Sequence, residues 1–239
     1  MENYKIFNEW REKVFEEGLK TVERNFPSRS LFRGFLSELM EVKFYATEFP
    51  KLSEDEKLIQ SEKLREELAD ALNYIGFLVA RYKNPLDHTN DSGKINLKLA
   101  IFLLLTDFYH MNTQIPQISL SEEDTKNYEL FINVVSEFIR KRIENPYEIF
   151  EQIDKKLIKE SVKIENFMRK YDERELAHYT TKENPYSEVV NSLHNIFTSL
   201  IACSLLYENW INIKDVFETG IRKIEIRSKE YESGKRKLQ

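Results

Sequence analysis

Residues 67–80 read Glu67-Leu68-Ala69-Asp70-Ala71-Leu72-Asn73-Tyr74-Ile75-Gly76-Phe77-Leu78-Val79-Ala80. From Ala71 to Ala80 the only polar side chains are those of Asn73 and Tyr74. A helix that is apolar on every side belongs inside a bundle, so we expect other helices to surround this one. Carboxylates entering such a helix are costly unless they are paired or bind a metal. That cost makes Glu67 and Asp70 the first candidates for a functional role.

The composition of the whole chain predicts an all-α protein. Of its 239 residues 41% are hydrophobic, which is enough for a packed core, and only six are glycine and six proline. Strands and tight turns use glycine and proline, whereas long helices do not. Between the prolines the apolar residues recur at helical spacing. This pattern predicts about eight helices, near residues 4–25, 29–48, 53–82, 95–113, 121–144, 147–179, 186–209 and 213–236.

The scarcity of glycine and cysteine excludes several kinds of site. The closest two glycines, Gly220 and Gly234, are fourteen positions apart, so neither a Rossmann fingerprint nor a P-loop can be written. Cys203 is the only cysteine, which excludes disulfides and cysteine zinc sites, and its apolar neighbours predict a buried thiol. The four histidines are scattered and form no metal-binding pair.

Charge and hydropathy bear on partners and location. The net charge of −5 argues against a protein that binds nucleic acid through bulk charge. Residues 1–5 carry an acid and no apolar run follows, so we expect no signal peptide. The longest uninterrupted apolar run, residues 99–105, is far shorter than a membrane span. We therefore expect a cytoplasmic protein with neither membrane nor nucleic acid as partner.

Two helices each carry a pair of acids on one face. Glu38 and Glu41 are three positions apart in the helix near 29–48, and Glu67 and Asp70 are three apart in the next helix. Residues at this spacing lie about 60° from each other around a helix. If the helices pack antiparallel with these faces together, four carboxylates surround one pocket. Such oxygen ligands suit Mg²⁺ or Mn²⁺ rather than zinc.

Acid pairs at this spacing also have an ordinary explanation. Acidic residues number 41 of 239, so such pairs arise by chance, as in Glu148, Glu151 and Asp154, which we interpret as a solvated face. The two selected pairs differ because each is embedded in a strongly apolar helix. For Asp70 the alternative is an acid near a helix start, or an ion-pair partner of a nearby arginine or lysine.

The arrangement of these acids resembles a known family. The E-x-x-E motif of residues 38–41, followed 25 residues later by the E-x-x-D motif of residues 67–70, is similar to the signature of all-α nucleoside triphosphate pyrophosphatases. That superfamily includes MazG proteins and dimeric dUTPases. The basic segment 221–231 resembles the family's closing helix. Its ordinary alternative is a cationic helix end that the helix dipole favours.

The resemblance implies a fold and a set of site residues. It implies a helical bundle with a four-helix catalytic core, in one domain spanning 1–239, with the core from 1–84 and 186–236 and a helical insertion at 85–185. It implies metal binding by Glu38, Glu41, Glu67 and Asp70. It implies substrate contacts from Asn73, Lys223, Arg227 and Tyr231.

The expected activity is Mg²⁺-dependent hydrolysis of a nucleoside triphosphate to its monophosphate and pyrophosphate, in a house-cleaning or nucleotide-pool role. Glu38 or Glu41 would orient or deprotonate the water. A dUTP/dCTP-type diphosphatase is one alternative, although the glutamine and asparagine pattern that opens dUTPases is absent. A non-enzymatic helical adaptor is another. Relatives pair through large apolar helices, so we also expect a homodimer, through helices such as 97–105 and 196–207.

Overall fold

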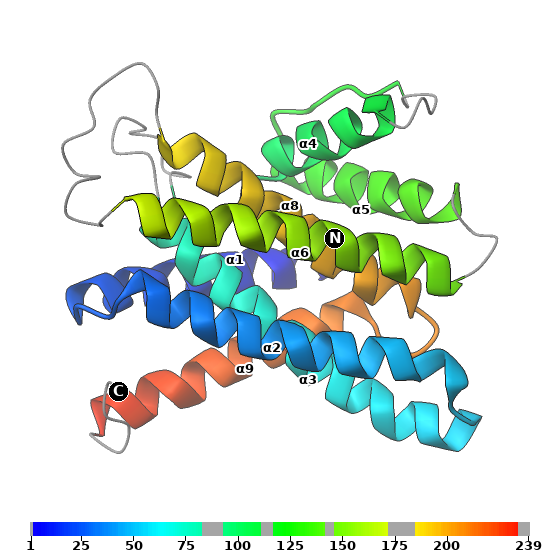
Figure 1. Ribbon diagram of the computed structural model, residues 1–239, viewed down its shortest axis with the longest axis horizontal. Coiled ribbons are helices and arrows are strands. Elements are labelled where there is room, and N and C mark those ends of the chain that lie inside the picture. Colours follow the sequence, from blue (N-terminus) through cyan, green and yellow to red (C-terminus); the bar gives the residue numbers. More distant parts are fainter. Residues whose placement is uncertain (1, 83–92, 111–116, 142–145, 172–184, 234–239) are drawn as a thin grey trace.

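The computed structural model describes residues 2–82, 93–110, 117–141, 146–171 and 185–233 (Figure 1). Within these ranges the chain forms eight α-helices and one 3₁₀ turn and contains no strand, which confirms the all-α prediction. The elements are α1 (Glu2–Glu23), α2 (Ser28–Glu48), η1 (Phe49–Lys51), α3 (Glu54–Arg81), α4 (Leu97–His110), α5 (Asp124–Arg140), α6 (Pro146–Lys170), α8 (Pro185–Leu206) and α9 (Ile213–Glu232).

Local chemistry fixes where the helices that carry the acids begin. The Ser53 side chain accepts a hydrogen bond from the backbone N–H of Glu56, whose carboxylate accepts one from the backbone N–H of Ser53 at 3.0 Å. This reciprocal pair satisfies two free N–H groups at the start of α3. Pro27, with φ −67° and ψ 137°, precedes α2 and sets its first turn. Only the five residues 49–53 connect α2 to α3, so the two helices pack as antiparallel neighbours.

Helix α3 is the centre of the bundle, as its apolar sequence predicts. It packs against α1, α2, α8 and α9, and every residue from Leu68 to Ala80 except Tyr74 is buried. Helix α1 approaches α3 closely, because a Cβ atom at Gly76 would lie 2.6 Å from the Val14 side chain. This close packing fixes the rotation of α3, and therefore the direction in which its acids point.

The remaining helices form a second part of the same bundle. Helix α8 packs against α3 and also against α4, α5 and α6. Buried apolar residues from all eight helices join in one continuous core. In Figure 1, α6 lies in front of α8, and α4 and α5 lie together above and to the right of it. The described part of the expected insertion is thus packed onto the core through α8.

Helix α8 is a core helix, which changes one expectation about assembly. Ile196, Phe197, Leu200 and Ile201 are fully buried within the chain, so most of the segment 196–207 is used inside the monomer and only its end, at Leu205 and Leu206, is half-buried. Cys203 is buried as predicted, and burial raises the pKa of its thiol to about 12. The stretch Ser187–Leu206 is long and apolar enough to cross a bilayer by length and composition. In this structure 78% of it is buried against other helices, as in the central helix of a bundle.

Candidate metal centre

Three of the four predicted metal ligands meet in the structure. Carboxylate oxygens of Glu38 on α2 and of Glu67 and Asp70 on α3 all lie within 4.8 Å of one another. Asp70 is buried, and the two glutamates are half-buried. The meeting follows from the antiparallel packing of α2 and α3, which turns the two acid-bearing faces toward each other. We call Glu38, Glu67 and Asp70 the acidic cluster.

Two bases of α9 lie against the acidic cluster. Lys223 donates from Nζ to Oδ2 of Asp70 at 2.5 Å, and Arg227 donates to Oδ1 at 2.7 Å. Lys223 also donates to the backbone carbonyl of Glu66 at 3.2 Å. The ion-pair interpretation of Asp70 is therefore correct for this structure. The same contacts bring the two residues expected to bind phosphate next to the residues expected to bind metal.

Burial and mutual repulsion change the protonation of the cluster. The pKa of Glu38 is raised to about 7. Burial is the largest cause, and the hydrogen bond to Glu67 and the negative charges of Asp70 and Glu67 raise the pKa further, while the positive charge of Arg227 lowers it. Burial also raises the pKa of Glu67, although its hydrogen bond with Glu38 lowers it. Carboxylates that share one site cannot all ionise cheaply. The cluster therefore holds a proton near neutral pH, in a place that a cation can take.

Glu41, the fourth predicted ligand, lies outside the acidic cluster. Its side chain is exposed on α2, yet its negative charge is close enough to raise the pKa of Glu67. The sequence predicted four carboxylates around one pocket. The structure brings three together and places the fourth at their edge, on the solvent side.

Asn73, predicted to contact the substrate, is fully buried. Its Oδ1 accepts a hydrogen bond from Nε1 of Trp10 at 2.8 Å, and its Nδ2 donates to the carbonyl of Gly220 at 3.1 Å. Both ends of the amide are thus satisfied, between α1, α3 and α9. Asn73 leaves no surface for a substrate in this conformation, and its role is to join three helices beside the cluster.

Tyr231 lines a small pocket next to the acidic cluster. The pocket, of about 70 Å³, lies between α1, α2, α3 and α9. Arg227 forms part of its wall and lies 5.6 Å from the ring of Tyr74, another wall residue. The guanidinium of Arg24 lies 4.7 Å from the ring of Tyr231. Arg227 therefore connects the pocket to Asp70.

Two residues of this pocket were missed by sequence reasoning. These residues are Glu17 and Arg24. Glu17 is buried and forms ion pairs with Arg24 at 2.6 Å and with Lys20 at 3.4 Å. Glu17 and Arg24 are seven positions apart, which is about two helical turns, so their spacing alone could have indicated that they lie on the same side of the helix. An acid buried on the inner side of α1 can be recognised only once the packing of α1 is known.

The donor set fits a hard divalent cation. Carboxylate oxygens are the ligands that Mg²⁺ and Mn²⁺ prefer, and the acidic cluster contains neither sulfur nor imidazole. No protein-family model, curated protein or solved structure matches this chain. The geometry of these residues and the motifs that carry them are therefore the only indications of what this chain does.

Proposed function

We propose that the protein is a Mg²⁺-dependent nucleoside triphosphate pyrophosphohydrolase, which converts an NTP or dNTP to the monophosphate and pyrophosphate. The observation that carries the proposal is the meeting of the acidic cluster with Lys223 and Arg227. Carboxylates that can hold a cation and bases that can hold phosphate are the two parts that phosphoanhydride hydrolysis requires.

In this proposal Glu38, Glu67 and Asp70 hold Mg²⁺, with Mn²⁺ as a substitute. The bound ion would neutralise charge on the phosphate oxygens and polarise the attacked phosphorus. Without a metal, Lys223 and Arg227 balance the charge of Asp70. A cation held there would leave Lys223 and Arg227 available to the triphosphate, to which Arg227 would offer the paired donors that suit phosphate oxygens.

We assign the attacking water to Glu41. The three clustered acids are engaged with one another, whereas Glu41 is exposed at the edge of the cluster. A carboxylate in that position can accept a hydrogen bond from a water and hold it in line for attack. Glu38, with a pKa of about 7, is the second group able to take a proton there.

The assembly expected for the proposed enzyme is a homodimer. Because α8 is largely internal, we expect the dimer surface at exposed apolar residues elsewhere, either on the expected segment 97–105, where Phe102 is 63% exposed, or on α2. Met40 and Phe44 lie one turn apart on α2 and are 65% and 62% exposed. Both flank Glu41, so a partner subunit covering them would also shield the site from bulk solvent. Light scattering at micromolar concentration tests this, and a monomer would contradict it.

The activity is tested with a panel of NTPs and dNTPs, including dUTP and dCTP, and pyrophosphate detection. We expect Mg²⁺-dependent release of pyrophosphate, and a Glu38→Gln variant that is inactive and no longer stabilised by Mg²⁺. Glu62→Gln is the matched control, because Glu62 is an exposed acid on α3 outside the cluster. Wild-type protein that neither gains melting temperature with Mg²⁺ or Mn²⁺ nor releases pyrophosphate would instead support the helical adaptor.

A further inference from the structure

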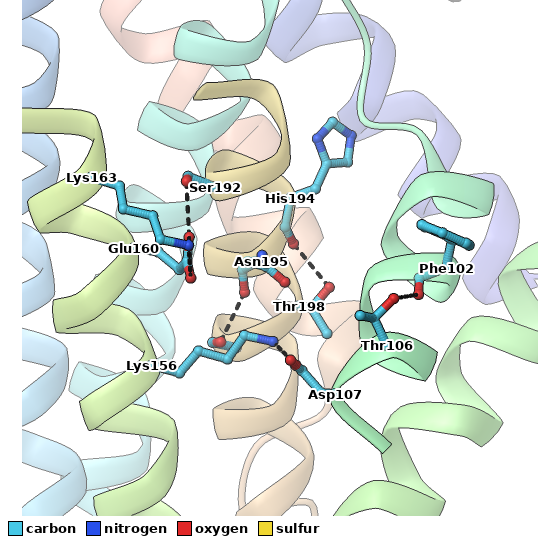
Figure 2. A network of polar contacts seen from close by, with 11 residues as sticks. Phe102, Thr106, Asp107, Lys156, Glu160, Lys163, Ser192, His194, Asn195 and Thr198 are labelled. Atoms are coloured by element: carbon cyan, nitrogen blue, oxygen red, sulfur yellow. Dashed lines mark hydrogen bonds and ion pairs between the residues drawn. The ribbon is translucent and has the colours of Figure 1, made fainter. Parts of the chain in front are cut away.

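A second cavity lies far from the acidic cluster along the chain, between α4, α5, α6 and α8. Its volume is about 290 Å³. Figure 2 shows α6 and α4 on opposite sides of α8, with Lys156 of α6 reaching across to Asp107 of α4. Helix α8 forms the floor between them. The cavity is formed by helices of the segment 85–185 together with α8. The proposed hydrolysis assigns no function to this segment.

The floor of this cavity is mainly apolar. The apolar residues that line it, each almost fully buried, are Leu104, Val135, Phe138, Ile153 and Ala202. Thr198 and Ser199 of α8 add two hydroxyls, which donate to the carbonyls of His194 and Asn195 at 2.9 and 2.8 Å (Figure 2). Since their protons are used within α8, the floor offers an occupant chiefly apolar contact.

The mouth of the cavity carries an excess of positive charge. Three lysines of α6 line it, Lys155, Lys156 and Lys159, against two acids, Asp107 and Glu160. Both acids are already neutralised. Lys156 pairs with Asp107, and Glu160 accepts from Lys163 at 2.9 Å and from Ser192 at 2.8 Å.

Two of the three lysines remain available to an anion. Among the residues that the structure describes, the one ion pair of Lys155 is with Glu151 on its own helix, at 2.6 Å, where both side chains are largely exposed and the pair is weak. Lys159 forms no ion pair with any residue that the structure describes. Lys155 and Lys159 are four positions apart, about one turn of α6, and both line the cavity.

We propose that this cavity binds a small amphiphilic anion, with its carboxylate at Lys155 and Lys159 and its hydrocarbon part against the floor of α8. A hydrocarbon chain gains free energy by covering the apolar floor, which a bare inorganic anion cannot do. A carboxylate gains charge-assisted contacts with the two lysines, which an alcohol of the same length cannot make. A medium-chain fatty acid combines both properties.

The test is calorimetric titration of the full-length protein with sodium octanoate, octan-1-ol and inorganic phosphate. We expect saturable binding of octanoate at one site per chain, and much weaker binding of the other two. The double variant Lys155→Gln/Lys159→Gln should bind octanoate at least ~tenfold more weakly. Lys5→Gln, an exposed lysine of α1 outside the cavity, is the matched control and should bind as the wild type does.

Three results would overturn the proposal. One is the absence of saturable octanoate binding at millimolar concentration. Another is octanoate binding by the double variant with wild-type affinity, which would remove the lysines from the site. The third is binding of octan-1-ol or phosphate as tightly as octanoate, which would show that the occupant does not need both a charge and a chain. None of the substituted residues belongs to the proposed hydrolytic site, so its activity should be unchanged in the double variant.

Discussion

Nζ of Lys223 lies 2.5 Å from Oδ2 of Asp70, although 153 positions separate the two residues. Arg227, one turn further along α9, binds the other oxygen of the same carboxylate. A divalent cation at the acidic cluster would therefore compete with two bases for one acid. Because of this competition, a change at Asp70, Lys223 or Arg227 should affect stability, metal binding and substrate binding together.

Asp70→Asn should destabilise the metal-free protein by about 1–3 kcal/mol, because it leaves two bases of α9 without their acid. Relief of repulsion with Glu38 and Glu67 offsets part of this cost. The variant should also lose pyrophosphate release and most of the Mg²⁺-dependent rise in melting temperature. Urea unfolding and melting curves with and without Mg²⁺ measure both effects. If Mg²⁺ stabilises the variant as much as the wild type, Asp70 is not a metal ligand.

Lys223→Ala and Arg227→Ala should each raise KM for the triphosphate by ~10- to 100-fold, the loss of a charge-assisted contact of about 1.5–3 kcal/mol. Each should also cost about 1 kcal/mol of stability without metal, since each leaves Asp70 with one partner. Lys229→Ala is the control, as Lys229 is exposed on the same helix. If the double variant Lys223→Ala/Arg227→Ala has unchanged kinetics, the two bases do not bind the triphosphate and only add positive charge near the end of α9.

Glu38 should lower the stability of the metal-free protein as pH rises from about 4.5 to 7, whereas the buried His194 acts in the opposite direction between about pH 4 and 6.5. The raised pKa of Glu38, about 7, means that the native state keeps a proton which the unfolded chain releases near 4.5. At Glu38 the native state then binds more protons in this window, so the contribution of this group to the free energy of unfolding decreases with pH. Glu38→Gln should remove this contribution, so that the free energy of unfolding rises more steeply with pH than in the wild type, and saturating Mg²⁺ should do the same in the wild type. Urea unfolding at several pH values gives the slopes, and identical slopes in variant and wild type would refute the prediction.

Asn73→Ala should destabilise the protein by about 2–3 kcal/mol, because the buried N–H of Trp10 and the carbonyl of Gly220 both lose their partner. Metal stabilisation of the folded variant should persist, since both ends of the Asn73 amide bind Trp10 and Gly220 and not the acidic cluster. Chemical unfolding and Mg²⁺ melting shifts separate the two effects. A variant of normal stability with a raised KM would restore Asn73 as a substrate contact.

His194 should make the protein lose stability in acid. Its Nε2 accepts from the backbone N–H of Asn96 at 2.9 Å and its Nδ1 lies 2.8 Å from the carbonyl of Val190, so the neutral ring is fully paired. Burial lowers the pKa of His194 to about 4, from the usual 6.5. Between these values the unfolded chain binds the extra proton, so acidification costs on the order of 3 kcal/mol.

The pH slope of the free energy of unfolding between 4 and 6.5 tests this. His194→Gln should be less stable at pH 7, where the paired ring is lost, and should show a smaller slope on acidification. A variant slope equal to that of the wild type would show that other groups cause the acid loss.

The sequence by itself determined the local features of this protein. The burial of α3 and of Cys203 follows from runs of apolar side chains, and the helices follow from the periodicity of such residues. The two acid pairs also follow from spacing, because a helix places residues three apart on one face whatever surrounds it. These properties depend on a few consecutive residues, so the printed sequence contains them.

Only the tertiary structure decided which side chains meet. The rotation of α2 and α3 about their axes brings Glu38 to Glu67 and Asp70 and leaves Glu41 at the edge. The docking of α9 gives Asp70 its two bases and turns Asn73 from a candidate substrate contact into a buried link between helices. The cavity between α6 and α8 likewise exists only where four helices converge. Such contacts join residues far apart in the chain, and their geometry is set by close packing, which no local pattern of residue types records.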